Sequence, residues 1–451
     1  MTPPAAIGSA LALAIGLTAG VSAPGGAQTD HDAVIRWATA AKHPLRTTKP
    51  EGSTRDLDAL LRMIGPARIV ALSEAVHLGA EPLEFRNRLF QALVERGGFT
   101  VIAIESGIAE GQVVHDYVNG APGNLKAVVD TGMSWMFGVT PQNRELVEWM
   151  RTRNQRGKPV RFYGFDVPGS PGNPKVRRRL QTGIDLTLAY LAEVDRAAES
   201  DLRTRLAPFL TLDPKTAVDG YAAMPVVDRN QVTAAIADLN ALLERRGPTY
   251  RSLISPEAYD WARRTAAGAR QTDNWLRRLP VGWKHTPGTR PAWFTDATNV
   301  RDRGMAENIE WILEREGPKA KILVFASRFH IATSRITDPG PADADTSIGL
   351  GQHLRARFGA DVVTIGNVIG GGRWGCDKFV FPVTAPASHS VDGTFAAVGT
   401  PLYYLDHRSA PKAVRAWLDQ EHPISEDPGS RVSPGRAFDL LVYFERTTPA
   451  C

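Results

Sequence analysis

The hydrophobic pattern of the chain alternates between short apolar runs and longer stretches with helical spacing. Runs such as IVALS, VIAIE and ILVFA are almost continuously apolar, which is typical of strands buried on both faces of a parallel sheet. The alternation predicts an α/β fold with a largely parallel central sheet flanked by helices. The expected strands are 68–73, 100–105, 160–166, 321–326, 362–367 and 438–444, and the expected helices are 82–96, 143–155, 301–316 and 349–358.

The segment 177–290 differs from the rest of the chain. It lacks strand-like runs, and Ala, Leu, Arg and Asp recur in it with helical spacing, as in VTAAIADLNALLERR. We therefore expect a helical insertion or subdomain that divides the α/β domain into 29–176 and 291–451. The stretch 280–295, rich in Pro, Gly and Trp, predicts a loop that returns the chain to the sheet. His285 lies in this loop and is a candidate for the wall of a substrate site.

The N-terminal residues 1–28 carry no charged side chain, and their apolar core at 7–21 is too short to span a bilayer comfortably. A secretory signal peptide is the interpretation that fits best, and a retained apolar anchor is the alternative. No later stretch reaches about 18 consecutive apolar residues, so we expect no stable membrane insertion after cleavage. The expected location is secreted or periplasmic. Cys376 and Cys451 form either one bridge or two free thiols.

Composition excludes several classes of protein. The 451 residues include 53 basic and 48 acidic side chains, a net charge of +5, and 43% hydrophobic residues, which is an ordinary globular balance. The basic residues are scattered among acidic ones, so we expect no nucleic-acid partner. The GGGRWG stretch at 370–375 fits a dinucleotide-binding pattern, but extended chain follows it in place of a helix. We expect no cofactor.

Titratable residues follow four of the expected strands at the same end. Glu74 and His77 come after the first strand, Glu105 ends the second, Asp166 ends the third and His330 follows the fourth. Ligands bind beyond the carboxyl ends of parallel strands, so these side chains are expected to face one site. A carboxylate three residues before a histidine fixes its tautomer and raises its basicity, which suits His77 to take a proton from water. The alternative for this pair is a capping turn in which His77 merely packs.

Two further features bear on the chemistry. Arg86 follows His77 by nine residues on the next expected helix. It is suited to hold a carboxylate or a developing oxyanion, and the alternative is a surface salt bridge with Glu81 or Glu84. Two histidines and several carboxylates are also suitable ligands for zinc or iron, but the tight histidine spacing of such sites is missing. We expect no metal.

Taken in order, these motifs resemble the erythromycin esterase family. The resemblance rests on E-x-x-H-x-x-x-E beginning at Glu74, Arg86 after it, the strand ending in Glu105, RFYGFD, RDRGMAENIEWILE, the strand leading to His330, and the closing FDLLVYFERTTPA. It covers about residues 54–449, nearly the whole mature chain, with the motifs in the family's order.

This resemblance implies hydrolysis of a lactone without a metal, with a histidine that activates water. His77 would be that general base, Glu74 and Glu105 would orient it or the water, and Arg86 would place charge in the pocket. We therefore expect a secreted or periplasmic hydrolase that cleaves a small-molecule ester or lactone. The alternative is a non-catalytic member of the family that binds a metal or another ligand. The oligomeric state is not predicted.

One segment departs from the family pattern. The family's A-H-N-x-H segment reads ASRFH at 326–330, so Ser327 replaces a histidine and Arg328 an asparagine, while His330 keeps the second histidine. Ser327, Arg328 and Asp166 are expected to contribute to substrate binding. The exchange removes an imidazole and adds a guanidinium, which is expected to favour an anionic substrate or to block the site.

Overall fold

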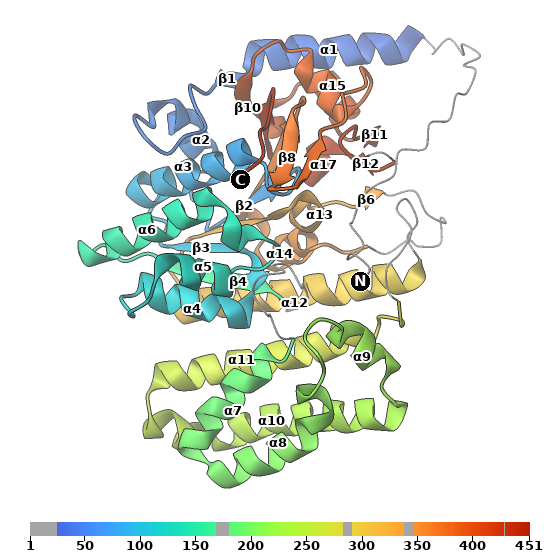
Figure 1. The fold of residues 1–451 in the computed structure, drawn as a ribbon. Helices are drawn as coiled ribbons and strands as arrows, with labels where there is room; N and C mark the ends of the chain where they lie inside the picture. Colours follow the sequence, from blue (N-terminus) through green and yellow to red (C-terminus); the bar gives the residue numbers. More distant parts are fainter. Residues whose placement is uncertain (1–24, 168–179, 283–290, 338–346, 428) are drawn as a thin grey trace.

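The central feature of the fold is an eight-stranded sheet (Figure 1). The computed structural model describes residues 25–167, 180–282, 291–337, 347–427 and 429–451. The strand order is β1-β10-β13-β7-β2-β5-β3-β4. The bounds of these strands are β1 (His43–Pro44), β2 (Ile69–Glu74), β3 (Val101–Gly107), β4 (Arg161–Asp166), β5 (Ile322–Ser327), β7 (Val362–Ile369), β10 (Leu402–Asp406) and β13 (Leu440–Phe444).

The six strands from β13 to β4 are parallel, and β10 and β1 extend the sheet in antiparallel pairing. These six are the strands expected from the apolar runs, and each observed end lies within two residues of the expected one. The α/β fold class is confirmed. The antiparallel strands were not expected, because β1 has only two residues and β10 has only three buried ones.

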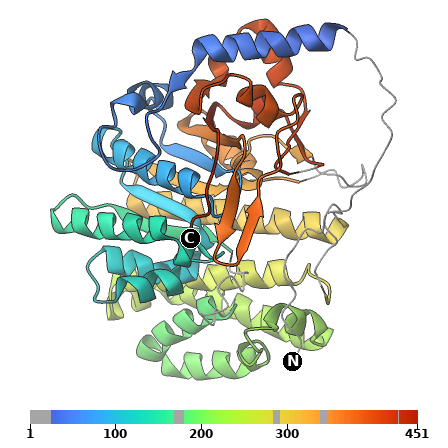
Figure 2. The same cartoon turned by 45° about the horizontal axis from the view of Figure 1, so that its top comes forward.

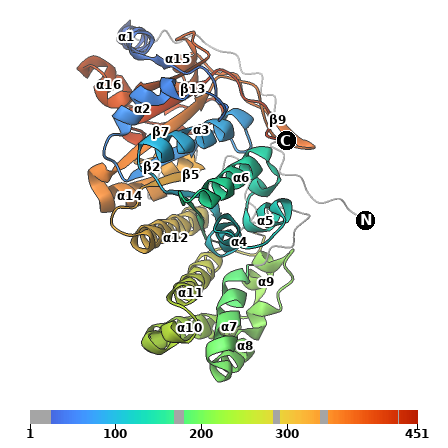
Figure 3. The same ribbon diagram turned by 90° about the vertical axis from the view of Figure 1, so that its left-hand side faces the viewer.

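Helices cover both faces of the sheet (Figure 3). Successive residues of β2 alternate between two cores: Val70 and Leu72 pack on one side, and Ile69 and Ala71 on the other. The helices of the first side are α2 (Asp58–Ile64), α3 (Ala80–Arg96), α5 (Leu125–Gly132) and α6 (Pro141–Gln155). Those of the second side are α1 (Gly25–Ala41), α12 (Ala292–Glu316), α14 (Leu350–Phe358), α15 (Val391–Ala396) and α16 (Lys412–Leu418).

The four expected helices are all present, but α12 begins nine residues earlier than 301, at Ala292. The predicted loop at 280–295 therefore extends too far, because its last residues already belong to α12. Pro291 immediately precedes the helix, where its fixed φ is tolerated, and the tryptophan that had favoured a loop is already helical. The rest of the loop, including His285, lies outside the described residues.

The helical subdomain is confirmed as a layer of its own below α12 (Figure 1). It consists of α7 (Thr182–Val194), α8 (Arg196–Leu210), α9 (Ala217–Ala223), α10 (Val226–Leu253) and α11 (Pro256–Leu276), with its own apolar core. It packs on the α/β domain through α11, which contacts α12 and α4 (Ile108–Val118). The expected boundaries at 176/177 and 290/291 fall in or beside segments outside the described residues, so they stay predictions.

Several short elements complete the structure. A small sheet joins β6, β11 and β12, and β8 and β9 form a hairpin beside the C-terminus (Figure 2). Their bounds and those of the remaining helices are β6 (Ile336–Thr337), β8 (Arg373–Cys376), β9 (Phe379–Pro382), β11 (His422–Pro423), β12 (Arg431–Val432), α13 (Arg328–Ile331), α17 (Pro434–Ala437), η1 (Arg55–Leu57), η2 (Phe137–Val139), η3 (Gly359–Asp361) and η4 (His407–Ser409).

Both ends of the described part of the chain contact the α/β domain. Helix α1 contacts α15 and α16, with Val34 and Ala38 in the core. Most of the expected signal peptide, 1–24, lies outside the described residues, and the signal peptide stays a prediction. Among the described residues, no helix combines the length and hydropathy needed to cross a bilayer. Of the two alternatives for Cys376 and Cys451, the structure shows the disulfide, with Cα atoms 4.6 Å apart.

The contact between subdomain and sheet depends on Trp261 of α11. Its ring stacks on Tyr163 of β4 at 5.8 Å and meets Trp311 of α12 at 5.3 Å. Because Trp261 is 4% exposed, Trp261→Ala is expected to lower the free energy of unfolding by about 3–5 kcal/mol. Urea denaturation followed by circular dichroism measures this. Leu253→Ala, at a position 55% exposed on α10, is the control and should change it by less than about 0.5 kcal/mol.

Candidate active site

The carboxyl end of β2 presents a histidine with a buried carboxylate behind it. Oε2 of Glu74 lies 2.8 Å from Nδ1 of His77, and Oε1 accepts a hydrogen bond from the backbone N–H of Leu78 at 3.2 Å. The Glu74 side chain is fully buried, whereas that of His77 is 49% exposed. Since a carboxylate only accepts, Nδ1 carries the proton and Nε2 is left as the basic nitrogen. The capping-turn alternative is wrong, because Glu74 binds the N–H of Leu78, which precedes helix α3, and the His77 ring is half exposed.

The local backbone fixes this arrangement. Leu78 has φ 60°, in the left-handed region that branched residues rarely adopt. This conformation turns the chain sharply after His77 and brings the Leu78 N–H back to Glu74. A conformation of this kind persists only where neighbouring groups hold it, and it is found most often at functional sites.

The charges around His77 favour its protonated form. Withdrawal from solvent by itself lowers the pKa of His77. The hydrogen bond and charge of Glu74, together with the charge of Glu105, outweigh this effect and raise the pKa above its usual value of about 6.5. A higher pKa means a stronger base, which suits proton abstraction near neutral pH.

Glu105 leaves β3 at an irregularity of the sheet. The register between β3 and β4 shifts between Ile104 and Gly107. Gly164 makes this possible, because a Cβ atom there would lie 2.4 Å from the carbonyl oxygen of Gly107. A bulge re-aims a side chain, and here Oε2 of Glu105 reaches β5 and accepts a hydrogen bond from the backbone N–H of Ser327 at 2.8 Å.

Arg301 of α12 lies between the carboxylates. Nη2 of Arg301 donates to Glu105 at 2.7 Å, and Nε and Nη2 hold Asp166 in a bidentate pair at 2.8 and 2.7 Å. The guanidinium also lies 4.9 Å from the ring centre of Trp135, whose indole N–H donates to Asp166 at 2.7 Å. Arg301 is the first residue of the RDRGMAENIEWILE motif, but helical periodicity does not mark it as a site residue, because it is one of several arginines on α12 and the periodicity signals only packing.

His330 completes the group. Its Nδ1 lies 2.8 Å from Asp302 and its Nε2 lies 3.3 Å from Glu105. Burial by itself lowers the pKa of His330, but the charges of Asp302 and Glu105 outweigh burial and raise it to about 10. His330 is therefore an imidazolium at neutral pH, and both of its ring nitrogens donate. The guanidinium of Arg301 lies beside this ring, with Nη1 3.1 Å from Nε2, and its Nη2 donates to the same Glu105 carboxylate at 2.7 Å. These cations lower the pKa of Glu105, although burial alone would raise it.

Arg86 has a different environment from the one expected. It is fully buried and donates to Asn87 at 3.1 and 2.7 Å and to Asn143 at 2.7 Å, with its guanidinium over the ring of Phe325. Burial lowers its pKa to about 10, although the nearby charge of Glu74 opposes that shift. The surface salt bridge is therefore wrong. Arg86 lies beneath the site, where its charge acts on Glu74.

The expected substrate-binding residues are also accounted for. Arg328 forms a buried ion pair with Glu426 and donates to the carbonyl oxygen of Ala75 at 2.9 Å. Asp166 is 1% exposed and engaged by Arg301. Ser327 is half-buried and contributes its backbone N–H to Glu105. The structure thus brings together the four strand ends, but the guanidinium of Arg328 is buried beside Glu426 and does not face solvent. Within the described residues, no group of three or more side chains is arranged to hold a metal ion.

Comparison with known proteins identifies the family of the chain. The sequence model named erythromycin esterase matches residues 94–447. The chain belongs to the erythromycin esterase family. The Escherichia coli erythromycin esterase type II is 21% identical over 399 residues, covering 84% of this chain and 90% of the relative. Membership of the family suggests hydrolase activity.

Solved structures share the fold. A Bacillus cereus protein superposes with a TM-score of 0.74 at 24% identity, covering 93% of this chain and 98% of its own. A mutant of the erythromycin esterase EreC in its open conformation gives 0.69 at 17% identity, covering 90% and 98%. At these identities the likeness shows the fold alone.

The charge of His330 predicts a pH-dependent stability. Its pKa is about 10 in the folded chain and about 6.5 unfolded, so its contribution is complete below pH 6.5 and is lost as the pH rises toward 10. At pH 6, His330→Gln is expected to lower the free energy of unfolding by roughly 3–5 kcal/mol, because it leaves Glu105 and Asp302 with one partner fewer. The loss should shrink toward pH 10 in urea titrations. A destabilisation that stays constant between pH 6 and pH 10 would contradict the charged state of His330. The control is His389→Gln, in an exposed loop.

Proposed function

We propose that this chain is an exported hydrolase that opens an ester or a lactone with water activated by His77. The observation that carries the proposal is the Glu74–His77 pair. A fully buried carboxylate fixes one ring nitrogen at 2.8 Å, and the ring itself is 49% exposed with its second nitrogen free to act as a base. A base of raised pKa at the carboxyl edge of a parallel sheet is where hydrolytic chemistry is expected.

The proposed reaction uses one proton twice. Nε2 of His77 takes a proton from water as the water oxygen attacks the carbonyl carbon. The negative charge that develops on the carbonyl oxygen is stabilised by nearby cations, and Arg301 and the His330 imidazolium are the two at this edge. The carbon–oxygen bond to the alcohol then breaks, and the leaving oxygen takes the proton back from His77. The products are a carboxylic acid and an alcohol, joined in one molecule when the substrate is a lactone.

The charges in the site favour a neutral or cationic substrate. The group contains four buried carboxylates, those of Glu74, Glu105, Asp166 and Asp302. The cations that act on these carboxylates are Arg86, Arg301 and the His330 imidazolium. Arg328 is buried beside Glu426, so its guanidinium is not exposed to an incoming anionic substrate. The names of the relatives support a macrolactone as the first substrate to test.

Export is supported by the covalent structure. Disulfides form and persist in oxidising compartments, so the Cys376–Cys451 disulfide supports a location outside the reducing cytosol. The uncharged apolar segment at the N-terminus supports the same location. The alternative of a metal-binding protein has no such support, because the described residues contain no group of three or more side chains arranged to hold a metal ion.

Removal of the base tests the proposal directly. The mature protein is incubated with erythromycin A and with 4-nitrophenyl butyrate, and mass spectrometry detects the addition of one water. His77→Ala is expected to lower kcat/KM by about 10²–10⁴-fold, the usual contribution of a general base. His389→Ala is the matched control. Full activity of His77→Ala would sink the proposal, as would the absence of turnover of any ester by the parent protein.

The Glu74 pair also predicts a shift in the pH profile. The base acts only when His77 is neutral, so kcat/KM should rise with pH through the raised pKa of His77. Glu74→Gln removes the charge that raises this pKa. The acid limb is therefore expected to move to lower pH, and the plateau to fall at least about tenfold because the ring loses its fixed tautomer. An acid limb at the same pH in both proteins would contradict this role.

A further inference from the structure

We propose that the Cys376–Cys451 disulfide is a positioning element for the base, acting through the backbone of Leu78. This inference rests on the proposed function, since it concerns how His77 is held. The carbonyl oxygen of Leu78 accepts two backbone hydrogen bonds, one from Gly375 at 3.1 Å and one from Ala450 at 3.0 Å. Each donor is the residue immediately before one of the two cysteines. The disulfide therefore links covalently the two segments whose N–H groups hold the carbonyl of the residue after the base.

The C-terminal tail runs alongside the segment that carries the base. The N–H of Ala80 donates to the carbonyl of Thr448 at 2.8 Å, and the N–H of Thr448 donates to Glu81 at 2.7 Å. Thr447 adds a hydroxyl bond to Glu81 at 2.9 Å. Gly79 allows this close approach, because a Cβ atom there would lie 2.6 Å from the Thr447 hydroxyl. The tail thus contacts the whole turn after His77.

The Leu78 peptide unit needs this support. Its N–H is held by Glu74 and its carbonyl by the disulfide-linked segments, while φ is 60°. Oε2 of the same Glu74 binds His77. If the carbonyl is released, Leu78 is free to relax to a common conformation, and Glu74 and His77 lose their relative orientation.

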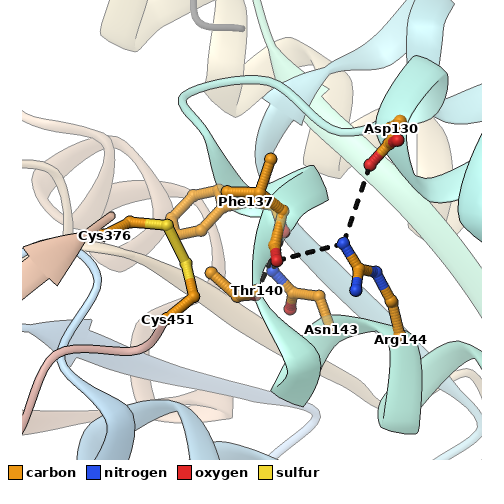
Figure 4. The surroundings of a disulfide bond; sticks show 8 residues. Asp130, Phe137, Thr140, Asn143, Arg144, Cys376 and Cys451 are labelled. Atoms are coloured by element: carbon orange, nitrogen blue, oxygen red, sulfur yellow. Dashed lines mark hydrogen bonds and ion pairs between the residues drawn. A yellow bond between two sulfur atoms is a disulfide. The ribbon is translucent and has the colours of Figure 1, made fainter. Parts of the chain in front are cut away.

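The disulfide itself is held against a fixed surface (Figure 4). Cys376 is 1% exposed and belongs to the same core as Phe137 of η2. The Phe137 carbonyl accepts hydrogen bonds from Asn143 at 2.8 Å and from the Thr140 hydroxyl at 3.0 Å, which fixes η2 on the start of α6. The tail is therefore placed between this surface and the turn after His77.

Two variants separate positioning from general stabilisation. Cys376→Ser with Cys451→Ser removes the covalent tie, whereas Ala450→Pro keeps the disulfide and removes one N–H that binds Leu78. Lys378→Ala, at the exposed tip of the hairpin, is the matched control. Each protein is studied well below its melting temperature. The readouts are kcat and KM for the ester identified above, and the His77 pKa from NMR titration of ¹⁵N-histidine-labelled protein, assigned with His77→Gln.

The expected result is a ten- to hundredfold fall in kcat in both test variants with a smaller change in KM, because a misplaced base costs rate. The His77 pKa should move down, since Glu74 no longer faces the ring. Lys378→Ala should match the parent protein. A lower melting temperature with an unchanged His77 pKa and kcat in both variants would overturn the proposal. The disulfide would then stabilise the fold without positioning the base. If the parent protein hydrolyses no ester, the proposed function fails, and the NMR titration alone still decides the positioning.

Discussion

The guanidinium of Arg301 between two buried carboxylates is the interaction on which the site depends. Glu105 and Asp166 end neighbouring strands, and without a cation between them two buried negative charges would repel each other. Arg301 comes from α12, on one face of the sheet, so it ties a helix to two strand ends at once. The next residue, Asp302, binds His330 beyond β5. One turn of α12 therefore supplies both the cation that binds Glu105 and Asp166 and the anion that binds His330.

The two histidines of the site divide two roles that a single histidine cannot combine. His330 is 8% exposed, lies between two carboxylates and is held as a cation. His77 has one carboxylate partner and an exposed ring, so it loses its proton more readily. The difference arises from the number of charges around each ring and their access to water. A fixed cation near a titratable base suits the hydrolysis proposed above, because a cation stabilises a developing negative charge.

The arginine at 328, where the segment 326–330 departs from the family pattern, has a partner inside the protein. An added arginine at a strand end would ordinarily change the charge of the pocket. Here Glu426, from the C-terminal part of the chain, pairs with Arg328 inside the protein. Burial raises the pKa of Glu426 well above its usual value, and the charge of Arg328 opposes that shift. The arginine also binds the Ala75 carbonyl, between Glu74 and His77, so the exchange supports the turn that carries the base.

The sequence by itself determined the parallel strands, the helical subdomain and the Glu74–His77 pair, because apolar runs and contacts three residues apart are local properties. It also placed Glu105, Asp166 and His330 at one edge, since parallel strands end at the same side. Only the tertiary structure decided the partners of these groups. Strand β5 enters between β2 and β3 from more than 200 residues later in the chain, and Arg301, Arg328 and Glu426 also come from parts of the chain far from β2, β3 and β4. Contacts at such separations leave no periodicity for the sequence to show.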